Sequence, residues 1–174
     1  MNSSLNDKAR AYQARPDLLK DRVVVITGAG DGIGRELAEK CAAHGATVVL
    51  VGRTTSKLEE VYDAIEAAGG PTPAIVPLDL AKADETELRA VGSALAEHFD
   101  CVHGLVHNAA LLGDRQPMAS TSYSTWVELM QVNVNAPLVL TQAILPLMDQ
   151  ADDASIIFTS SGVGRRGQIG RAHV

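Results

Sequence analysis

The sequence has few aromatic residues and few cysteines, and both shortages restrict what the chain can be. Phe, Trp and Tyr make up 3% of the 174 residues, so a core has to be built from Val, Ile, Leu and Ala. The two cysteines, Cys41 and Cys101, form no Cys-x-x-Cys pair and have no His at zinc-ligand spacing. We therefore predict buried free thiols, no metal site, and a reducing, cytoplasmic environment.

Long apolar runs and an excess of positive charge are also missing. No stretch is long and apolar enough to cross a bilayer, and the first twenty residues lack the apolar centre of a secretory signal. The formal net charge is −6, and the basic residues form no stripe that would meet a phosphate backbone. We therefore expect neither nucleic acid nor a membrane as a partner.

The sequence does contain a strict alternation of short apolar runs with segments of helical periodicity. Five runs are apolar on both faces, which is typical of buried parallel strands. They begin at Val23, Thr47, Ala74, Val102 and Ser155. Because the connections between them are helical, the pattern predicts an α/β fold of Rossmann type, with a doubly wound parallel sheet of strand order 3-2-1-4-5.

The first predicted strand ends in a glycine-rich turn, Thr27-Gly28-Ala29-Gly30-Asp31-Gly32-Ile33-Gly34. Gly28 permits a tight turn, Gly32 lets the backbone approach a phosphate, and Gly34 lets the following helix pack against the sheet. The backbone amides of Gly32, Ile33 and Gly34 begin this helix, where the helix dipole favours an anion. In its βαβ setting, the turn predicts a site for the pyrophosphate of a dinucleotide.

The end of the second predicted strand bears on which dinucleotide is bound. An NAD site of this fold places an acid there for the ribose 2′-OH, whereas this chain has Gly52 followed by Arg53. A guanidinium suits a 2′-phosphate, and Arg35 on the first helix is a second candidate cation. Asp31, which we also expect at the nucleotide, argues the other way. We expect NADP(H) to be preferred, with NAD(H) as the alternative.

The spacing Gly-x-x-x-Gly-x-Gly, with Thr27 before it and Ile33 within it, resembles the short-chain dehydrogenase/reductase family. The resemblance runs from about residue 21 to residue 167. It implies an oxidoreductase that transfers hydride between NADP(H) and a small-molecule carbonyl or alcohol substrate. It also implies a homo-oligomer for the full-length protein.

The same resemblance assigns residues after the third and fourth predicted strands. Asp79 matches the family aspartate that contacts the adenine ring. Asn108 belongs to His107-Asn108-Ala109-Ala110, which is similar to the family's Asn-Asn-Ala-Gly segment along the cofactor. His107 and Ala110 depart from that segment.

The family resemblance also implies a catalytic set of Ser, Tyr, Lys and Asn. Asn133 matches the Asn; because Pro137 has no N–H, we expect a helix kink and an Asn133 carbonyl that is free to hold a relay water. Ser161, after the last predicted strand, matches the Ser, with Ser160 as the alternative.

The implied Tyr and Lys have no counterpart in this sequence. The family places its Tyr thirteen residues after the Ser, which here is Val174, and no Tyr follows Tyr123 and no Lys follows Lys82. Residues 169–174 resemble the translation of a sequencing-library adapter, so we expect a non-native tail there. We then expect a tail over residues 1–20, a partial dinucleotide-binding domain over 21–168 that is incomplete at its C-terminus, and no reductase activity in this chain itself.

Two other interpretations remain open. A regulatory module that binds a dinucleotide without chemistry would explain the glycine-rich turn and Arg53 equally well. A methyltransferase also has a glycine-rich turn after its first strand, but its cofactor has no pyrophosphate. That interpretation leaves Asn133 and Ser161 unexplained.

Overall fold

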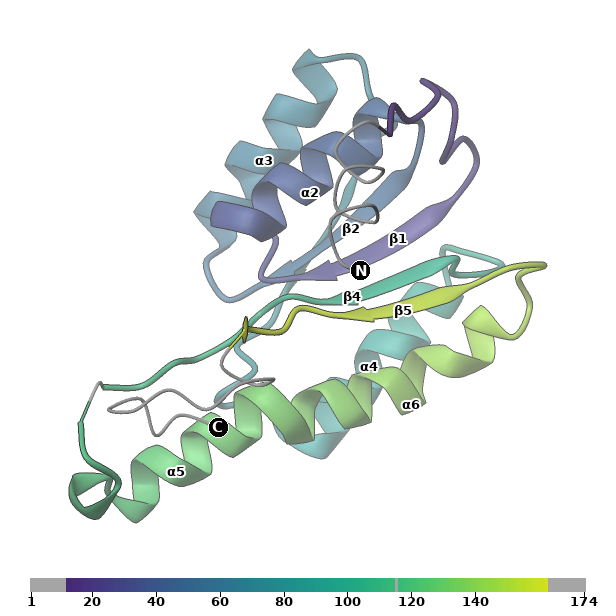
Figure 1. Cartoon of the computed structure of the whole chain (residues 1–174). Helices are drawn as coiled ribbons and strands as arrows, with labels where there is room; N and C mark the ends of the chain where they lie inside the picture. The colour runs from purple at the N-terminus through teal and green to yellow at the C-terminus, as the bar shows by residue number, and fades with distance from the viewer. Residues whose placement is uncertain (1–11, 115, 163–174) are drawn as a thin grey trace, which may run out of the picture.

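The computed structural model describes residues 12–114 and 116–162, and their centre is a parallel sheet (Figure 1). The strands are β1 (Val23–Thr27), β2 (Thr47–Gly52), β3 (Ala74–Pro77), β4 (Gly104–His107) and β5 (Ser155–Phe158). Their order is β3-β2-β1-β4-β5 and each neighbouring pair is parallel, which confirms the predicted fold class. β4 begins two residues later than predicted because the Val102 N–H donates to the Leu147 carbonyl, outside the sheet.

Helices cover both faces of this sheet, as a doubly wound fold requires (Figure 1). One face carries α2 (Gly32–Ala43) and α3 (Thr55–Ala67), and the other carries α4 (Glu85–Ala96) and α6 (Ala136–Met148). A 3-10 turn, η1 (Met118–Ser120), precedes α5 (Tyr123–Met130). A π-helical segment, η2 (Gln131–Asn135), joins α5 to α6.

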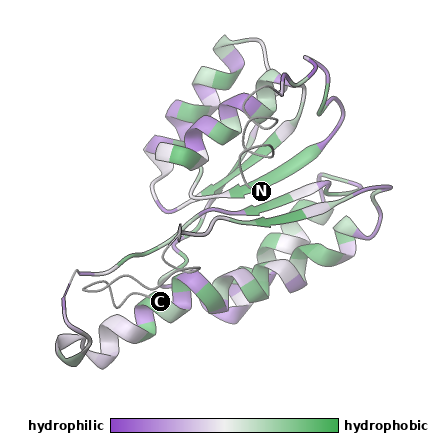
Figure 2. Cartoon of the chain, in the orientation of Figure 1, coloured by the Kyte–Doolittle hydropathy of each residue, from purple (hydrophilic) through white to green (hydrophobic). Residues whose placement is uncertain are grey.

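The core is divided by the alternation of side chains along each strand. In β1, Val24 and Ile26 pack with α2 and α3, whereas Val25 packs with α4 and α6. In β2, Leu50 faces the first layer and Val49 the second, and both are fully buried. An apolar run therefore supplies both faces of the sheet, and Figure 2 shows the hydrophobic colour concentrated along β1 and β4.

The two ends of the described chain differ in how they are packed. Residues 16–21 form a turn in which the Leu19 N–H donates to the His44 carbonyl, so part of the predicted tail contacts the end of α2. At the other end, β5 is an edge strand of the described sheet, and Ile157 and Phe158 are more than half exposed. The expectation for residues 169–174 falls outside the described residues.

No helix within residues 12–114 and 116–162 combines the length and the apolar character needed to cross a membrane.

Candidate functional site

A cavity of about 350 Å³ opens at the carboxyl ends of the parallel strands. Its lining includes Gly28 after β1, Arg53 after β2, Asp79 after β3 and Asn108 after β4. The winding of the chain reverses between β1 and β4, the place where open α/β sheets bind ligands. With Asp31, which also lines it, the cavity brings together half of the ten site residues predicted from the sequence.

The glycine-rich turn holds the start of α2 close to the sheet. Gly28 has a φ of +69°, which makes the tight turn predicted for it. A Cβ on Gly34 would lie 2.1 Å from the Gly28 carbonyl oxygen and 2.7 Å from Asn108 Nδ2. The first turn of α2 therefore contacts both the turn and the end of β4, because position 34 has no side chain.

The backbone amides at the start of α2 are only partly engaged by the protein itself. Asp31 is the N-cap, and its Oδ1 accepts the Gly32 N–H at 2.7 Å. Within the described residues, no side chain accepts a hydrogen bond from the N–H of Ile33 or Gly34. In the part of the chain that the structure describes, two of the three amides predicted to meet a phosphate thus have no side-chain acceptor, whereas the third donates to the Asp31 carboxylate.

Asp31 also has a cationic partner that the sequence analysis missed. Lys57 Nζ lies 2.5 Å from Asp31 Oδ2, and this hydrogen bond, with that from Gly32 N–H, lowers the pKa of the Asp31 carboxyl. Lys57 lies on the first turn of α3, four residues after Arg53. Its place on the helix after the Arg53 loop was the signal available in the sequence.

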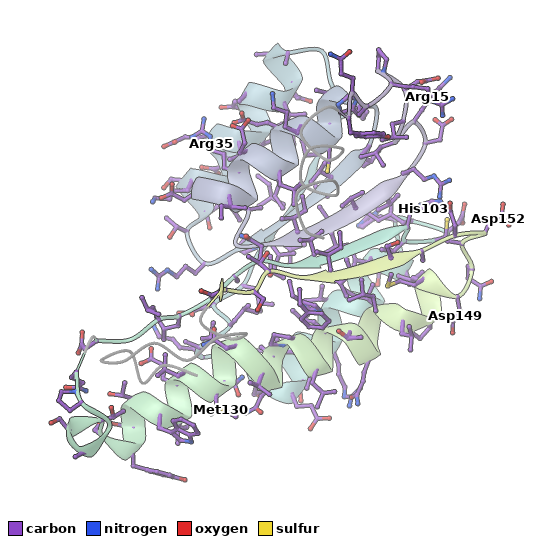
Figure 3. All side chains as sticks on the ribbon, in the orientation of Figure 1. Arg15, Arg35, His103, Met130, Asp149 and Asp152 are labelled. Atoms are coloured by element: carbon purple, nitrogen blue, oxygen red, sulfur yellow. The ribbon has the colours of Figure 1, made fainter. Side chains whose placement is uncertain are left out.

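The other charged residues of the nucleotide prediction are divided between the cavity and the outer surface. Arg53 is exposed, lines the cavity, and forms no ion pair within the described residues. Arg35, the second candidate cation, instead pairs with Glu39 at 2.8 Å and with Glu60 at 3.5 Å, on the α2–α3 side of the sheet (Figure 3). The structure therefore favours Arg53 over Arg35 as the guanidinium that faces a ligand.

Asp79 combines a structural contact with its place at the cavity. Its Oδ1 accepts the Ala81 N–H at 3.1 Å, which stabilises the turn after β3, and Lys82 Nζ lies 3.6 Å from its Oδ2. The adenine contact implied by the family resemblance stays a prediction.

Thr27, noted in the sequence only as the residue before Gly28, organises the floor of the site. Its side chain is 1% exposed, and its Oγ1 accepts the N–H groups of Asn108 and Ala109, both at 3.0 Å. Asn108 Nδ2 donates in return to the Thr27 carbonyl at 3.2 Å, and Thr159 Oγ1 donates to Asn108 Oδ1 at 3.4 Å. One hydroxyl therefore aligns the ends of β1 and β4, with β5 joined through Asn108.

We expect Thr27→Val to lower the free energy of unfolding by about 2 kcal/mol, because it leaves the part-buried N–H groups of Asn108 and Ala109 unpaired, at the lower end of about 1–3 kcal/mol each. Thr27→Ser keeps the hydroxyl and is the matched control, with an expected loss of about 1 kcal/mol for the methyl group. Urea unfolding followed by circular dichroism measures both. Equal stability of the Val and Ser variants would show that the hydroxyl does not hold the strand ends together.

Asn133 fixes a backbone segment rather than lining the cavity. Its Oδ1 accepts the Leu111 N–H at 2.9 Å, and its Nδ2 donates to the Leu111 carbonyl at 2.8 Å. Leu111 itself lines the cavity, so Asn133 positions one wall. Where the kink is predicted, the structure records η2, in which the Ala136 N–H donates to the Gln131 carbonyl five residues earlier. Pro137, which has no N–H, follows directly, and the kink itself stays a prediction.

Ser160 and Ser161 follow β5 at the same edge of the sheet as the cavity. Both are exposed, and neither belongs to the cavity lining within the described residues. The catalytic assignment of Ser161 therefore stays a prediction, with Ser160 as its alternative.

His107, the departure from the family segment, is a buried structural residue. It is 5% exposed, its Nε2 lies 2.9 Å from Thr141 Oγ1, and its ring stacks on Phe158 with centroids 4.8 Å apart. Burial lowers the pKa of His107 to about 4. The ring is therefore neutral at physiological pH and joins β4 to α6 and β5.

This lowered pKa predicts that acid weakens the fold. Because the folded pKa of about 4 lies below the unfolded value of 6.5, protons bind the unfolded chain first as the pH falls below 6.5. We expect His107 alone to remove about 2 kcal/mol of the free energy of unfolding between pH 7 and pH 5. Urea unfolding at both pH values measures this loss, and His107→Asn should show a smaller one. An equal loss in both proteins would contradict the assignment.

Comparison with known proteins is consistent with this geometry. Residues 22–173 match the sequence model of the short chain dehydrogenase family. Over 157 residues the chain is 45% identical to the uncharacterized oxidoreductase YciK of Escherichia coli (strain K12), covering 90% of this chain and 62% of YciK.

Solved structures of similar proteins have the same fold. The structure of the oxidoreductase yciK from E. coli matches with a TM-score of 0.87 and 44% identity, over 91% of this chain and 65% of that chain. A protein from Escherichia coli CFT073 assigned as a short chain dehydrogenase, and complexed with NADPH, matches with a TM-score of 0.85 and 44% identity, over 88% and 64%.

The chain spans less than two thirds of the length of each of these relatives. Within that span the family match covers nearly all of the sequence, and the sheet order is the one that the alternation of apolar runs with helical segments predicts. The family model and the relatives described above are dehydrogenases or oxidoreductases, not methyltransferases. The chain belongs to the short chain dehydrogenase family of oxidoreductases.

Proposed function

We propose that this chain is the nucleotide-binding part of an oxidoreductase that transfers hydride between NADP(H) and a small-molecule carbonyl or alcohol. The observation that carries the proposal is the cavity at the carboxyl edge of the sheet, where Gly28, Arg53, Asp79 and Asn108 meet. A relative of 44% identity was solved in complex with NADPH, which supports the choice of cofactor.

The residues of the cavity, together with the start of α2, whose N-cap Asp31 lines the cavity, fit a dinucleotide. The amides of Ile33 and Gly34 are oriented by α2 toward its N-terminal end, where they would receive the pyrophosphate. A Cβ on Gly28 would lie 3.0 Å from the Ala109 Cα, so the absent side chain lets the turn and the end of β4 line one continuous wall. Arg53, exposed and without an ion pair in the described chain, would face the 2′-phosphate.

The bound nicotinamide would supply the hydride, and the protein would supply orientation and proton handling. Asn133 would hold the Leu111 backbone against the nucleotide. Ser161, with Ser160 as the alternative, would orient the substrate oxygen. The sequence offers no Tyr or Lys after Ser161 as a proton donor, so we expect binding without carbonyl reduction from these 174 residues.

Isothermal titration calorimetry of this chain with NADPH and with NADH tests the proposal. We expect NADPH to bind at least about tenfold more tightly, since one charge-assisted hydrogen bond to the 2′-phosphate is worth about 1.5–3 kcal/mol. The titrations should be run on protein whose folded state has been verified by a cooperative thermal transition. Folded protein that binds neither nucleotide at millimolar concentration would refute the proposal.

A further inference from the structure

The charges lining the cavity do not by themselves favour an anionic ligand. Among its described lining residues, Asp31, Asp79 and Glu128 carry carboxylates, against the one guanidinium of Arg53. A dinucleotide with a 2′-phosphate brings further negative charge to the same space. Like charges that share one cavity repel each other, so the cations beside these carboxylates decide whether an anionic ligand binds.

Lys57 is held at the carboxylate closest to the start of α2. Its Nζ lies 2.5 Å from Asp31 Oδ2, while the other oxygen of Asp31 accepts the Gly32 N–H at 2.7 Å. The Asp31 carboxylate is thus fixed at both oxygens, by the helix start on one side and by the lysine on the other.

The backbone of Lys57 is fixed as well, because two glycines let α3 approach the turn. A Cβ on Gly30 would lie 3.0 Å from Lys57 Cβ, and a Cβ on Gly52 would lie 3.1 Å from Leu58 Cδ2. Leu58, the next residue, is 1% exposed and belongs to the core between α2, α3 and the sheet. The ammonium group of Lys57 is therefore presented to Asp31 from an anchored helical turn.

Other cations are less well placed to cancel this charge. Arg35 is paired with Glu39 and Glu60. Lys82 pairs with Asp79, with 3.6 Å between Nζ and Oδ2. The Lys82 side chain is 86% exposed, compared with 49% for Lys57. Within the described chain, the cation at hydrogen-bond distance from the Asp31 carboxylate is thus Lys57.

We propose that Lys57 is a specificity-determining residue that neutralises Asp31 at the mouth of the cavity, and so permits the 2′-phosphate of NADP(H) to bind beside Arg53. The inference rests on the proposed function. Lys57 acts through Asp31 rather than by gripping the phosphate itself. Its removal exposes an uncompensated carboxylate to the nucleotide, and the penalty is larger for NADPH than for NADH because NADPH carries the additional phosphate.

A double-mutant cycle on this chain tests the inference, with Kd values for NADPH and NADH from calorimetry. Lys57→Met should weaken NADPH binding by about tenfold and NADH binding by about threefold or less. In an Asp31→Asn background the same substitution should change the Kd for NADPH by less than about twofold. Lys57→Arg, which keeps the ion pair, should stay within about threefold of the wild type.

The outcomes separate this inference from the proposed function. If the wild type prefers NADPH but Lys57→Met does not weaken its binding, the inference is wrong and the function stands. An equal effect of Lys57→Met in both backgrounds would also overturn it, because Lys57 would then act independently of Asp31. If the folded wild type binds neither nucleotide, the proposed function fails first. Thermal melting of each variant verifies folding, which the half-exposed Lys57 side chain is not expected to disturb.

Discussion

Gly34→Ala is expected to lower the free energy of unfolding by about 3 kcal/mol and to weaken NADPH binding by at least about tenfold. The new Cβ would lie 2.1 Å from the Gly28 carbonyl oxygen, a backbone atom that cannot move without displacing the turn. It would also lie 2.7 Å from Asn108 Nδ2, whose hydrogen bond to the Thr27 carbonyl joins β4 to β1. Adding a single methyl group at position 34 is therefore expected to push the start of α2 away from the wall of the cavity.

Two alanine variants at other glycines isolate this steric effect. Among the described residues, no atom lies within 4 Å of a Cβ placed on Gly162, and its φ is not positive, so Gly162→Ala is expected to change the free energy of unfolding by no more than about 0.5 kcal/mol. A Cβ on Gly32 also meets no atom of residues 12–114 or 116–162 within 4 Å, but φ is +52° there, so Gly32→Ala is expected to cost about 1–2 kcal/mol from the backbone alone. Urea unfolding ranks the three. A Gly34→Ala protein as stable as Gly162→Ala would show that α2 does not pack as closely as the structure places it.

Arg53→Ala is expected to weaken NADPH binding by about ten- to a hundredfold and to change NADH binding by less than about threefold. The guanidinium lies on the loop after β2, at the cavity, with no carboxylate paired to it within the described residues. Under the proposed function, its loss would therefore remove a contact that only the 2′-phosphate makes. Calorimetric Kd values for both nucleotides measure the ratio.

Arg89→Ala is the matched control for charge. Arg89 lies on α4, pairs with Glu85 at 2.8 Å, and is absent from the described lining of the cavity. Removing it changes the net charge by the same amount, and we expect both Kd values to stay within about twofold. Should Arg53→Ala weaken NADPH and NADH equally, Arg53 would contribute to general anion binding and not to the choice between the nucleotides.

The sheet was predictable from the sequence because each strand is a short apolar run followed by residues that favour a turn. Val23–Thr27 is largely buried and ends at a glycine-rich turn, and this pattern is typical of a central strand. β4 was less well bounded, because Val102 is as apolar as a strand residue but donates its N–H to the end of α6. This hydrogen bond from Val102 to α6 in place of the sheet depends on where the helix lies, so no local pattern in the sequence predicts it.

Residues of the candidate site were predictable where the residue type by itself indicates the role at that position. The roles of three residues follow from their type and their position in the motif: Gly28 and Gly34 permit a tight turn and a close approach, and Arg53 supplies a positive charge after β2. Lys57 and Thr27 could not be assigned in this way. Their roles arise from partners on other elements, the Asp31 carboxylate for Lys57 and the N–H groups at the end of β4 for Thr27.

The departures from sequence-based expectation share this physical origin. Arg35 has the charge expected of a phosphate ligand, but α2 turns it toward Glu39, one helical turn away. Asn133 has the expected residue type, and its amide is used to hold Leu111 at the wall. In both cases the type of side chain was evident, whereas its direction was set by the packed helix.

Titration of ¹⁵N-labelled protein with NADPH, followed by NMR, tests most directly whether the carboxyl edge of the sheet receives a dinucleotide. The amide resonances of residues 28–34, Arg53, Asp79 and Asn108 should shift together and saturate with one Kd, and NADH should shift Arg53 less than NADPH does. A larger cavity of about 750 Å³ lies between α4 and α5. Shifts confined to that cavity, or no shifts at millimolar NADPH, would contradict the account.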